Sequence, residues 1–254
     1  MTGALPASRH RIAPWAWPMV AVRLAGLLAM LLICAPLHYV FAPFTARNPV
    51  PRWFLRSVAA IAGVRVRLRG ERPARRSFLI ANHVSWIDIP ALAGATGSAF
   101  VAHDGLAQIG PLRWLCSLND TVFVARHERR SVAAQVEQVR TALRETGALT
   151  IFAEGTTSDG TGTLPFKSSL LSAMEGDADT IPVQPVWLDY GAETREIAWV
   201  GEEPGLDNAL RILARLRPVD LTIHFLPPLG PEDRADRKRM ASAARAAIDE
   251  ALAR

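Results

Sequence analysis

The sequence ANHVSWIDIP places an imidazole and a carboxylate five residues apart, at His83 and Asp88. On a regular helix this spacing turns two side chains about 140° apart, so the two cannot share a helix face. They can meet if a tight turn follows His83 and Asp88 folds back from the first turn of the next helix. The carboxylate then accepts a hydrogen bond from one imidazole nitrogen and leaves the other nitrogen free as a base. The alternative is a loop histidine beside a helix-capping aspartate, and this short motif by itself does not exclude it.

A second polar cluster, AEGTTSDG, follows the apolar run LTIF. Glu154 ends the expected strand, and Gly155, Thr156, Thr157 and Ser158 continue into a turn. Backbone N–H groups and hydroxyls in such a turn are good donors to an anion or an oxyanion. An ordinary surface turn has the same composition, but two polar clusters at the ends of apolar runs favour a site.

No marked nucleophile accompanies these clusters. The sequence has no G-x-S-x-G turn for a serine nucleophile, no G-x-x-x-x-G-K-[ST] phosphate loop and no G-x-G-x-x-G fingerprint. A His–Asp base without a nucleophile suits activation of a hydroxyl that belongs to the substrate. We expect neither a metal nor a cofactor, because the other histidines are not at metal-ligand spacing; they are His10, His38, His103, His127 and His224.

The length and the hydrophobic pattern indicate which elements position these residues. The 254 residues, half of them hydrophobic, suffice for one compact domain with an appendage. Two cysteines cannot build a disulfide scaffold. After residue 62, apolar runs of strand length alternate with helical patterns, which predicts an α/β domain with a mostly parallel sheet flanked by helices. The expected strands are 64–70, 77–83, 98–103, 121–126, 149–155, 182–190, 196–201 and 220–228, and the expected helices are 131–146, 205–217 and 231–254.

The N-terminal part has the pattern of a membrane anchor. Residues 24–44 are a run of 21 without a formal charge, which is long enough to span a bilayer as a helix. A helix bent at Pro36 that dips into one leaflet fits the pattern as well as a straight crossing does. The run lacks a small-residue cleavage site, which argues against a removed signal peptide, and its basic flanks argue against a buried core helix. We expect an N-terminal helical membrane anchor with an interfacial helix in residues 1–61, and the α/β domain in residues 62–254.

Charge is unevenly distributed along the chain, behind a net charge of +5. Residues 1–76 carry twelve arginines and one acidic residue, whereas residues 77–254 carry 17 basic and 23 acidic side chains. A basic segment on an acidic domain points to a polyanionic partner. Because these arginines are interleaved with a membrane-length apolar run, an anionic membrane surface fits them better than nucleic acid does.

Residues 60–230 resemble the glycerolipid acyltransferases of the 1-acyl-sn-glycerol-3-phosphate (lysophosphatidate) acyltransferase type. Four blocks match in order. Residues 82–88 match the catalytic block N-H-x-x-x-x-D, and residues 100–126, which end at Arg126, match the second block. FAEGT at 152–156 matches the third block and IPVQPV at 181–186 the fourth. One block would be weak evidence, but four in order behind an anchor are specific.

The resemblance implies an acyltransferase for groups other than aminoacyl groups that transfers a fatty acyl group directly, without an acyl-enzyme. His83 would remove the proton of the acceptor hydroxyl as it attacks an acyl thioester, and Asp88 would orient the ring. The donor would be acyl-acyl carrier protein or acyl-coenzyme A and the acceptor a lysolipid, at the cytoplasmic face of a bacterial inner membrane. The residues that would place the acceptor or stabilise the oxyanion are Glu154, Gly155, Thr156, Thr157 and Arg126.

Departures from the family pattern bear on the acceptor. The third block usually reads Phe-Pro-Glu-Gly-Thr-Arg, whereas Ala153 and Thr157 stand here in place of the proline and the arginine; in the second block a lysine is usual where His103 stands. Both missing cations are associated in the family with the acceptor's phosphate, and each charge-assisted bond is worth about 1.5–3 kcal/mol. Cations that could replace them are Arg126, Arg129, Arg130 and Lys167.

Two acceptors therefore stay open. Lysophosphatidate, which gives phosphatidic acid, is the acceptor for most of this family and is the first expectation. The variant EGTTSDG resembles the bacterial lyso-ornithine lipid O-acyltransferases, whose acceptor has an amino-acid headgroup. Functions of other classes are a non-catalytic membrane-surface protein, which has no need of His83, Asp88 and Glu154 together, and a lipid hydrolase in which His83 activates water. A transacylase that takes its acyl group from a phospholipid is a further variant.

Overall fold

The computed structural model describes residues 12–45, 48–103, 110–124, 137, 139, 141–143, 147–169, 171 and 181–253. Its helices are α1 (Trp17–Phe41), α2 (Val50–Ile61), α3 (Asp88–Thr96), α4 (Gly110–Ser117), α6 (Thr194–Ile197), α7 (Gly205–Leu213) and α8 (Arg237–Leu252), with 3-10 turns at Pro14–Ala16, Gly191–Glu193 and Glu232–Arg234. Its strands are β1 (Val64–Gly70), β2 (Ser77–Ala81), β3 (Ala99–His103), β4 (Val122–Val124), β5 (Ala148–Phe152), β6 (Val183–Asp189) and β7 (Val219–Phe225).

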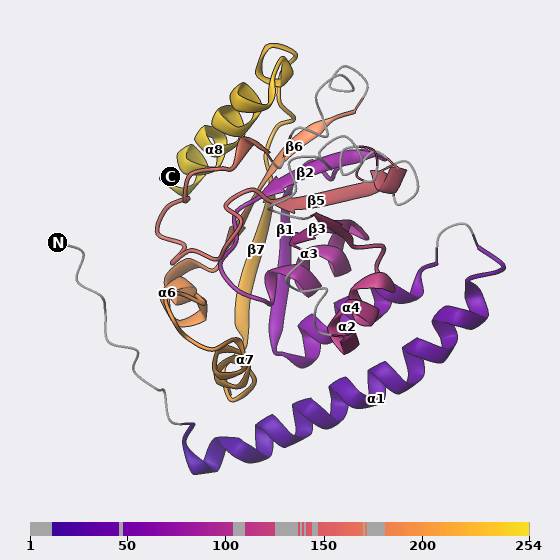
Figure 1. The fold of residues 1–254 in the computed structure, drawn as a ribbon. Coiled ribbons are helices and arrows are strands. Elements are labelled where there is room, and N and C mark those ends of the chain that lie inside the picture. The colour runs from indigo at the N-terminus through magenta and orange to yellow at the C-terminus, as the bar shows by residue number, and fades with distance from the viewer. Residues whose placement is uncertain are drawn as a thin grey trace.

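The described strands form one sheet in the order β1-β7-β6-β2-β5-β3-β4 (Figure 1). All neighbours are parallel except β6 and β7, so the predicted α/β fold with a mostly parallel sheet is confirmed. Every residue of β2 is buried, as expected for a central strand covered on both faces. Ala81 of β2 is aligned with Phe152 of β5 and Val186 of β6. The carboxyl ends of these strands, and the residues that follow them, therefore meet at one edge of the sheet.

Each face of the sheet packs against its own set of helices. On one face, Leu79 and Ala81 contact apolar residues of α2, α3 and α7. On the other face, Phe78 and Ile80 contact α8 and the helical residues Val139, Ala142 and Leu143. The alternation follows the two-residue period of a strand. We call these the α2 face and the α8 face of the sheet.

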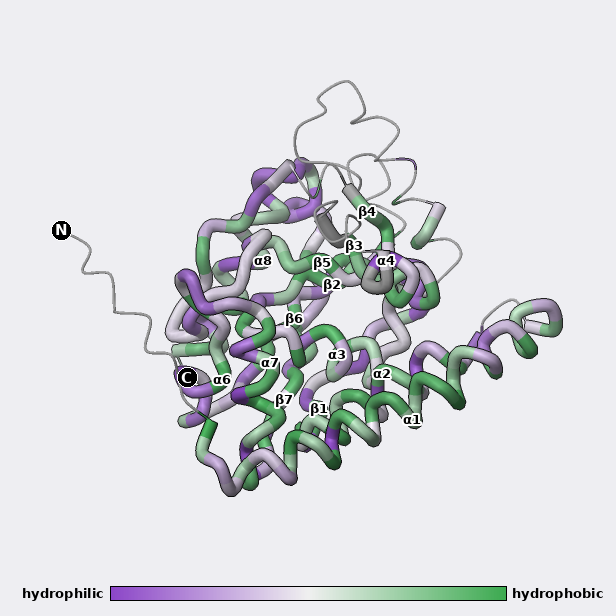
Figure 2. The backbone as a smooth tube through the Cα atoms, turned by 60° about the horizontal axis from the view of Figure 1, so that its bottom comes forward, coloured by the Kyte–Doolittle hydropathy of each residue, from purple (hydrophilic) through white to green (hydrophobic). Residues whose placement is uncertain are grey.

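Helix α1 runs along one side of the domain, at the bottom of Figure 1, and continues through Pro36 without ending there. Figure 2 colours most of it hydrophobic, although most of its side chains are exposed. The helical stretch Pro14–Phe41 is long and apolar enough to cross a membrane by length and composition. Helix α2 lies against α1 and contributes Ala59 to the core on the α2 face. Helix α1 thus packs on the domain and presents an exposed apolar surface.

Two arginines fasten this helical layer to the domain. Arg23 of α1 donates to two carbonyls at the end of α7, at 3.2 and 3.1 Å. Arg52 of α2 donates to two carbonyls at the end of α3, at 3.2 and 2.7 Å. Carbonyls at a helix C-terminus lack intrahelical partners and attract cations. Gly94 lets α2 and α3 approach, because a Cβ there would lie 2.7 Å from Cα of Arg56.

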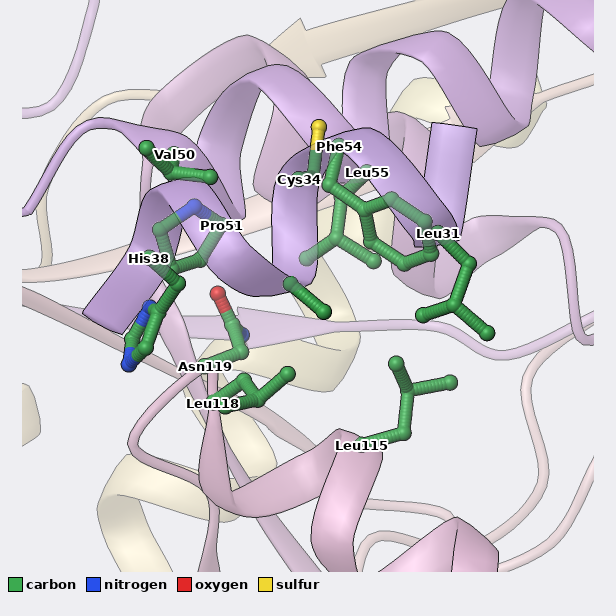
Figure 3. Close-up of a pocket in the computed structure, with 11 residues that line it drawn as sticks. Leu31, Cys34, His38, Val50, Pro51, Phe54, Leu55, Leu115, Leu118 and Asn119 are labelled. Carbon is green, nitrogen blue, oxygen red and sulfur yellow. The ribbon is translucent and has the colours of Figure 1, made fainter. Parts of the chain in front are cut away.

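An apolar pocket of about 350 Å³, its mouth included, lies between α1, α2 and α4 (Figure 3). Most of the side chains that line it are hydrocarbon, with His38 and Asn119 as the polar exceptions. The pocket lies among helices α1, α2 and α4 and contains no residue of the two predicted polar clusters. Its lining residues are Leu31, Cys34, Ala35, His38, Val50, Pro51, Phe54, Leu55, Leu115, Leu118 and Asn119.

Residues 196–201, predicted as a strand, are not one. The segment begins within α6, and its buried residues Ile197 and Ala198 pack on the α2 face. Trp199 N donates to Val84 O at 2.9 Å, which ties the segment to the turn after β2. Its apolar pattern therefore reflects this cover over the core, not pairing in the sheet. The expected helix 131–146 lies mostly outside the described residues, of which 137, 139 and 141–143 are helical.

Candidate active site

The turn after β2 brings His83 and Asp88 together. The side-chain amide of Asn82 accepts a hydrogen bond from Leu188 N at 2.7 Å and donates one to Leu188 O at 3.2 Å. These two bonds fix the end of β2 to β6. The chain then turns, and α3 begins at Asp88. His83 Nδ1 lies 2.8 Å from Asp88 Oδ2. This is the arrangement that the five-residue spacing required: a turn, then a carboxylate folded back from the first turn of the helix.

Asp88 is a carboxylate held by several donors at once. Its side chain is fully buried, and Oδ2 accepts the backbone N–H groups of Val84 at 2.6 Å and Ser85 at 2.9 Å, besides the imidazole. The other oxygen, Oδ1, accepts a hydrogen bond from the hydroxyl of Tyr190, just after β6. Charge-assisted bonds of this kind are about twice as strong as neutral ones. The orientation of Asp88, and through it that of His83, is therefore fixed before any substrate arrives.

Tyr190 is a constant donor in this network. The residue is buried, and burial, followed by the adjacent Asp88 charge, raises the pKa of Tyr190 well above its ordinary value. Its hydroxyl therefore stays protonated at working pH. Sequence reasoning missed Tyr190, because it lies 102 residues from Asp88 along the chain.

The imidazole of His83 is held by packing as well as by hydrogen bonding. Its ring stacks on Phe152 at 4.0 Å between centroids and 13° between planes. If Nδ1–H donates to Asp88, Nε2 carries the lone pair, as a general base requires. The side chain of His83 is 15% exposed, so it is not sealed from substrate. Phe152 was also missed as a support for the ring, since its match to the third block gave no hint of the stacking.

Glu154 connects the two predicted clusters. Its carboxylate is almost completely buried; Oε1 accepts His83 N at 2.9 Å and Oε2 accepts Leu164 N at 2.9 Å. Burial raises the pKa of Glu154, while these two backbone donors and the Ser158 hydroxyl act to lower it. Both carboxylate oxygens of Glu154 are thus hydrogen-bonded within the protein, and the bond to His83 N holds the backbone of His83 in place. Its expected contact with the acceptor stays a prediction.

The turn after Glu154 packs against the same backbone. Gly155 has φ +69°, a left-handed conformation that favours glycine, and a Cβ there would lie 2.8 Å from Nζ of Lys167. Thr156 is exposed, whereas the Thr157 hydroxyl donates to the carbonyl of Trp199. Ser158 N donates to His83 O at 2.7 Å. The two polar clusters therefore form one hydrogen-bonded unit.

Other predicted residues are not brought into this unit. Arg126, and the alternative cations Arg129 and Arg130, lie outside the described residues. Lys167 is described and is exposed beside Gly155. Within the described part of the chain, no three His, Cys, Asp or Glu side chains gather as metal ligands would; the expectation of a metal-free and cofactor-free site stays a prediction.

Comparison with known proteins identifies the family of the chain. The Acyltransferase family matches residues 45–189, more than half of the chain. A lyso-ornithine lipid O-acyltransferase of Rhodobacter capsulatus is 33% identical over 95% of this chain and 90% of its own length. A 1-acyl-sn-glycerol-3-phosphate acyltransferase of Neisseria gonorrhoeae is 28% identical over 70% of this chain and 71% of its own.

A solved structure gives independent support for the fold. The crystal structure of the 1-acyl-sn-glycerophosphate acyltransferase of Thermotoga maritima superposes with a TM-score of 0.59 at 19% identity, over 92% of this chain and 96% of that one. The predicted resemblance is thus confirmed by the family match, by relatives over most of the chain and by the fold. The chain belongs to the acyltransferase family and is an acyl-transferring enzyme.

Proposed function

We propose that this enzyme is a membrane-bound lysolipid O-acyltransferase in which His83 is the general base and Asp88 its positioning partner. The observation that carries the proposal is the 2.8 Å contact between Nδ1 of His83 and the buried carboxylate of Asp88, with no serine or cysteine motif beside it. A base without a nucleophile suits direct transfer to a hydroxyl that the substrate supplies.

The acyl transfer requires only His83, Asp88, the acceptor hydroxyl and the acyl thioester. Nε2 of His83 takes the proton of the acceptor hydroxyl as its oxygen attacks the thioester carbonyl carbon. The C–O bond forms, the C–S bond breaks, and the proton passes from His83 to the departing thiolate. The Asp88 carboxylate stabilises the imidazolium between these events. The fixed position of the ring, between Phe152 and Asp88, reduces the reorientation that the step requires.

Of the two candidate acceptors we put lyso-ornithine lipid first. Thr157 stands where the family usually has an arginine, and its hydroxyl is engaged by the Trp199 carbonyl, so this position offers no charge to a phosphate. Lys167, beside Gly155, is one cation, which suits the single carboxylate of an ornithine headgroup better than a phosphate dianion. The relative named lyso-ornithine lipid O-acyltransferase also matches more of this chain than the Neisseria relative does.

Lysophosphatidate is the second candidate, and the Neisseria relative supports it. The two acceptors share a free hydroxyl and an acyl chain that stays in the bilayer. The exposed apolar side of α1 and the pocket between α1, α2 and α4 support a position at the membrane surface. We place the catalytic domain at the cytoplasmic face, where acyl thioesters are available.

The test uses the purified protein in vesicles with radiolabelled acyl thioester and each acceptor in parallel, and His83→Ala as the control. We expect diacyl product from lyso-ornithine lipid that is absent in His83→Ala. Product from lysophosphatidate alone would assign the second candidate. Release of free fatty acid without an acceptor would identify a hydrolase, and product without any thioester a transacylase. Absence of His83-dependent product from both acceptors would contradict the mechanism.

Thr157→Arg tests the acceptor argument separately. An arginine at this position restores the cation that the family associates with phosphate, so the variant should use lysophosphatidate better relative to lyso-ornithine lipid. The ratio of kcat/KM for the two acceptors is the measurement. An unchanged ratio would remove Thr157 from the explanation of acceptor choice.

A further inference from the structure

The edge strand β1 presents a row of arginines to solvent. Val64 belongs to the core on the α2 face and Leu68 packs against it. Because successive side chains of a strand alternate between faces, Arg65, Arg67 and Arg69 project from the opposite face of the sheet. All three are exposed. We call these three residues the arginine strip.

The arginine strip points away from the anchor. Helices α1 and α2 pack on the α2 face, where Leu27 and Leu55 contact the core, whereas the strip lies on the α8 face. In Figure 1, α1 and α8 lie on opposite sides of the domain. Of the three arginines in α1 and α2, Arg23 and Arg52 are engaged by helix-end carbonyls, and Arg56 is exposed. The strip is therefore placed to face water when α1 rests on a bilayer.

The charge of the strip is only partly balanced by its neighbours. Arg67 lies 3.5 Å from Asp220, an exposed pair, and exposed pairs bind weakly. Arg69 lies near His224, which it disfavours as a cation, and Asp189 lies beside that histidine at 3.7 Å. In the described part of the chain, the ion pairs beside these three positive charges involve the exposed carboxylate of Asp220 and the partly covered one of Asp189.

The strip is in line with the active site across the sheet. The turn residue Asn82, next to His83, bonds to Leu188; Leu188 pairs with Ile223, and Ile223 pairs with Leu68, between Arg67 and Arg69. Three strand spacings of about 4.8 Å separate β2 from β1, a lateral distance of about 14 Å. A carrier protein bound at the strip would therefore bring its thioester to His83 on a flexible arm that spans about this lateral distance.

We propose that the arginine strip docks the acidic carrier protein that delivers the acyl thioester. The inference rests on the proposed function, which requires a thioester donor. Charge complementarity names the partner, since a row of guanidinium groups attracts a carboxylate-rich surface and raises its association rate. The position of the strip separates the two substrates: the lysolipid arrives from the α1 side, within the bilayer, and the carrier from the aqueous side.

The test is the charge reversal Arg65→Glu/Arg67→Glu/Arg69→Glu in the full-length protein, in vesicles of phosphatidylethanolamine and phosphatidylglycerol. We expect KM for acyl-acyl carrier protein to rise about tenfold or more at low salt, with kcat retained. Kinetics with acyl-coenzyme A and co-sedimentation with the vesicles should not change. The salt dependence of the carrier reaction should weaken, because the wild-type attraction is electrostatic.

A matched control reverses three other basic residues on the α8 side, Arg237→Glu/Lys238→Glu/Arg239→Glu at the start of α8. This control has the same change in net charge and should leave KM for the carrier unchanged. If the first triple variant fails to fold, Arg65→Gln/Arg69→Gln retains the Arg67–Asp220 pair and should raise the same KM by a smaller factor.

Each alternative outcome overturns the proposal in a distinct way. Loss of vesicle binding would make the strip a membrane contact. An unchanged KM for the carrier, or an equal effect in the control triple, would exclude docking at the strip. A wild-type enzyme that uses acyl-coenzyme A but not the carrier would end this proposal and leave the proposed function standing. A wild-type enzyme inactive with both donors would instead refute the proposed function.

Discussion

Two histidines of this protein lie next to an aspartate and stack on an aromatic ring, but the two pairs are built differently. His83 Nδ1 and Asp88 Oδ2 are 2.8 Å apart, a hydrogen bond, whereas His224 Nε2 and Asp189 Oδ2 are 3.7 Å apart, beyond hydrogen-bonding distance. The ring stacking is similar, with centroid distances of 4.0 and 4.5 Å. Residue types and aromatic packing therefore do not distinguish the pairs.

The surroundings of the carboxylates do distinguish them. Asp88 is fully buried and accepts two backbone N–H groups and a tyrosine hydroxyl in addition to the imidazole. Asp189 is partly exposed and accepts Gly191 N at 2.7 Å. The buried Nε2 of His224 has no hydrogen-bond partner within the described residues. A His–Asp pair becomes a candidate base when the carboxylate is buried, held by several donors and hydrogen-bonded to the ring. The first pair meets this condition, whereas Asp189 has one backbone donor, is partly exposed and lies 3.7 Å from the ring of His224.

The largest contrast is expected from removal of each imidazole. His83→Ala should lower kcat by about 10²–10⁴-fold, the usual contribution of a general base, with folding retained. His224→Ala should leave kcat near the wild-type value, because the nearest oxygen of Asp189 is 3.7 Å from that ring, beyond hydrogen-bonding distance. Acyl transfer from a thioester to a lysolipid is the measurement. Similar losses in both variants would mean that the carboxylate geometry does not select the base.

Neutralising each carboxylate sharpens the same contrast. Asp88→Asn can still accept from the backbone of the turn but loses the charge that stabilises the imidazolium, so kcat should fall about a hundredfold or more. Asp189→Asn should leave it nearly unchanged. A loss of binding rather than of rate in Asp88→Asn, seen as a raised KM with normal kcat, would contradict a positioning role.

Tyr190→Phe removes one hydrogen-bond donor from Asp88 of the His83–Asp88 pair and leaves the aromatic packing in place. A hydrogen bond to a charged carboxylate is worth about 1.5–3 kcal/mol, so kcat should fall by about ten- to a hundredfold without a change in KM. Tyr39→Phe, in the anchor helix, is the control. A lower unfolding temperature with normal kinetics would reduce Tyr190 to a structural residue.

The His83–Asp88 pair also shows which parts of this site could be predicted from the sequence. The spacing of His83 and Asp88 predicted how the two could meet, because both lie within one turn, where local geometry decides, although the motif by itself left the alternative of a helix-capping aspartate open. Two polar clusters at the ends of apolar runs favoured a site, and the rule that parallel strands end at one edge explains why this turn meets Glu154. The hydroxyl of Tyr190 and the commitment of Glu154 to backbone donors were not predictable, because each depends on how distant segments pack. The error at 196–201 has the same origin, since an apolar pattern does not tell a covering segment from a strand.

The smallest predicted effect concerns the His224–Asp189 pair and the pH dependence of the free energy of unfolding. Burial lowers the pKa of His224 from its ordinary 6.5, aided by Arg69 and opposed by Asp189. The folded protein therefore binds fewer protons here than the unfolded chain does, so this group favours the native state above pH 6.5 and its contribution is lost as the pH falls below that value. His224→Gln, which does not titrate, should lose less stability than the wild type between about pH 7 and 5, as measured by thermal unfolding. If Asp189 held His224 as Asp88 holds His83, the imidazolium would be favoured and the pKa raised. The wild type would then lose more stability than the variant on going from about pH 5 to 7, so the sign of the effect states which kind of pair this is.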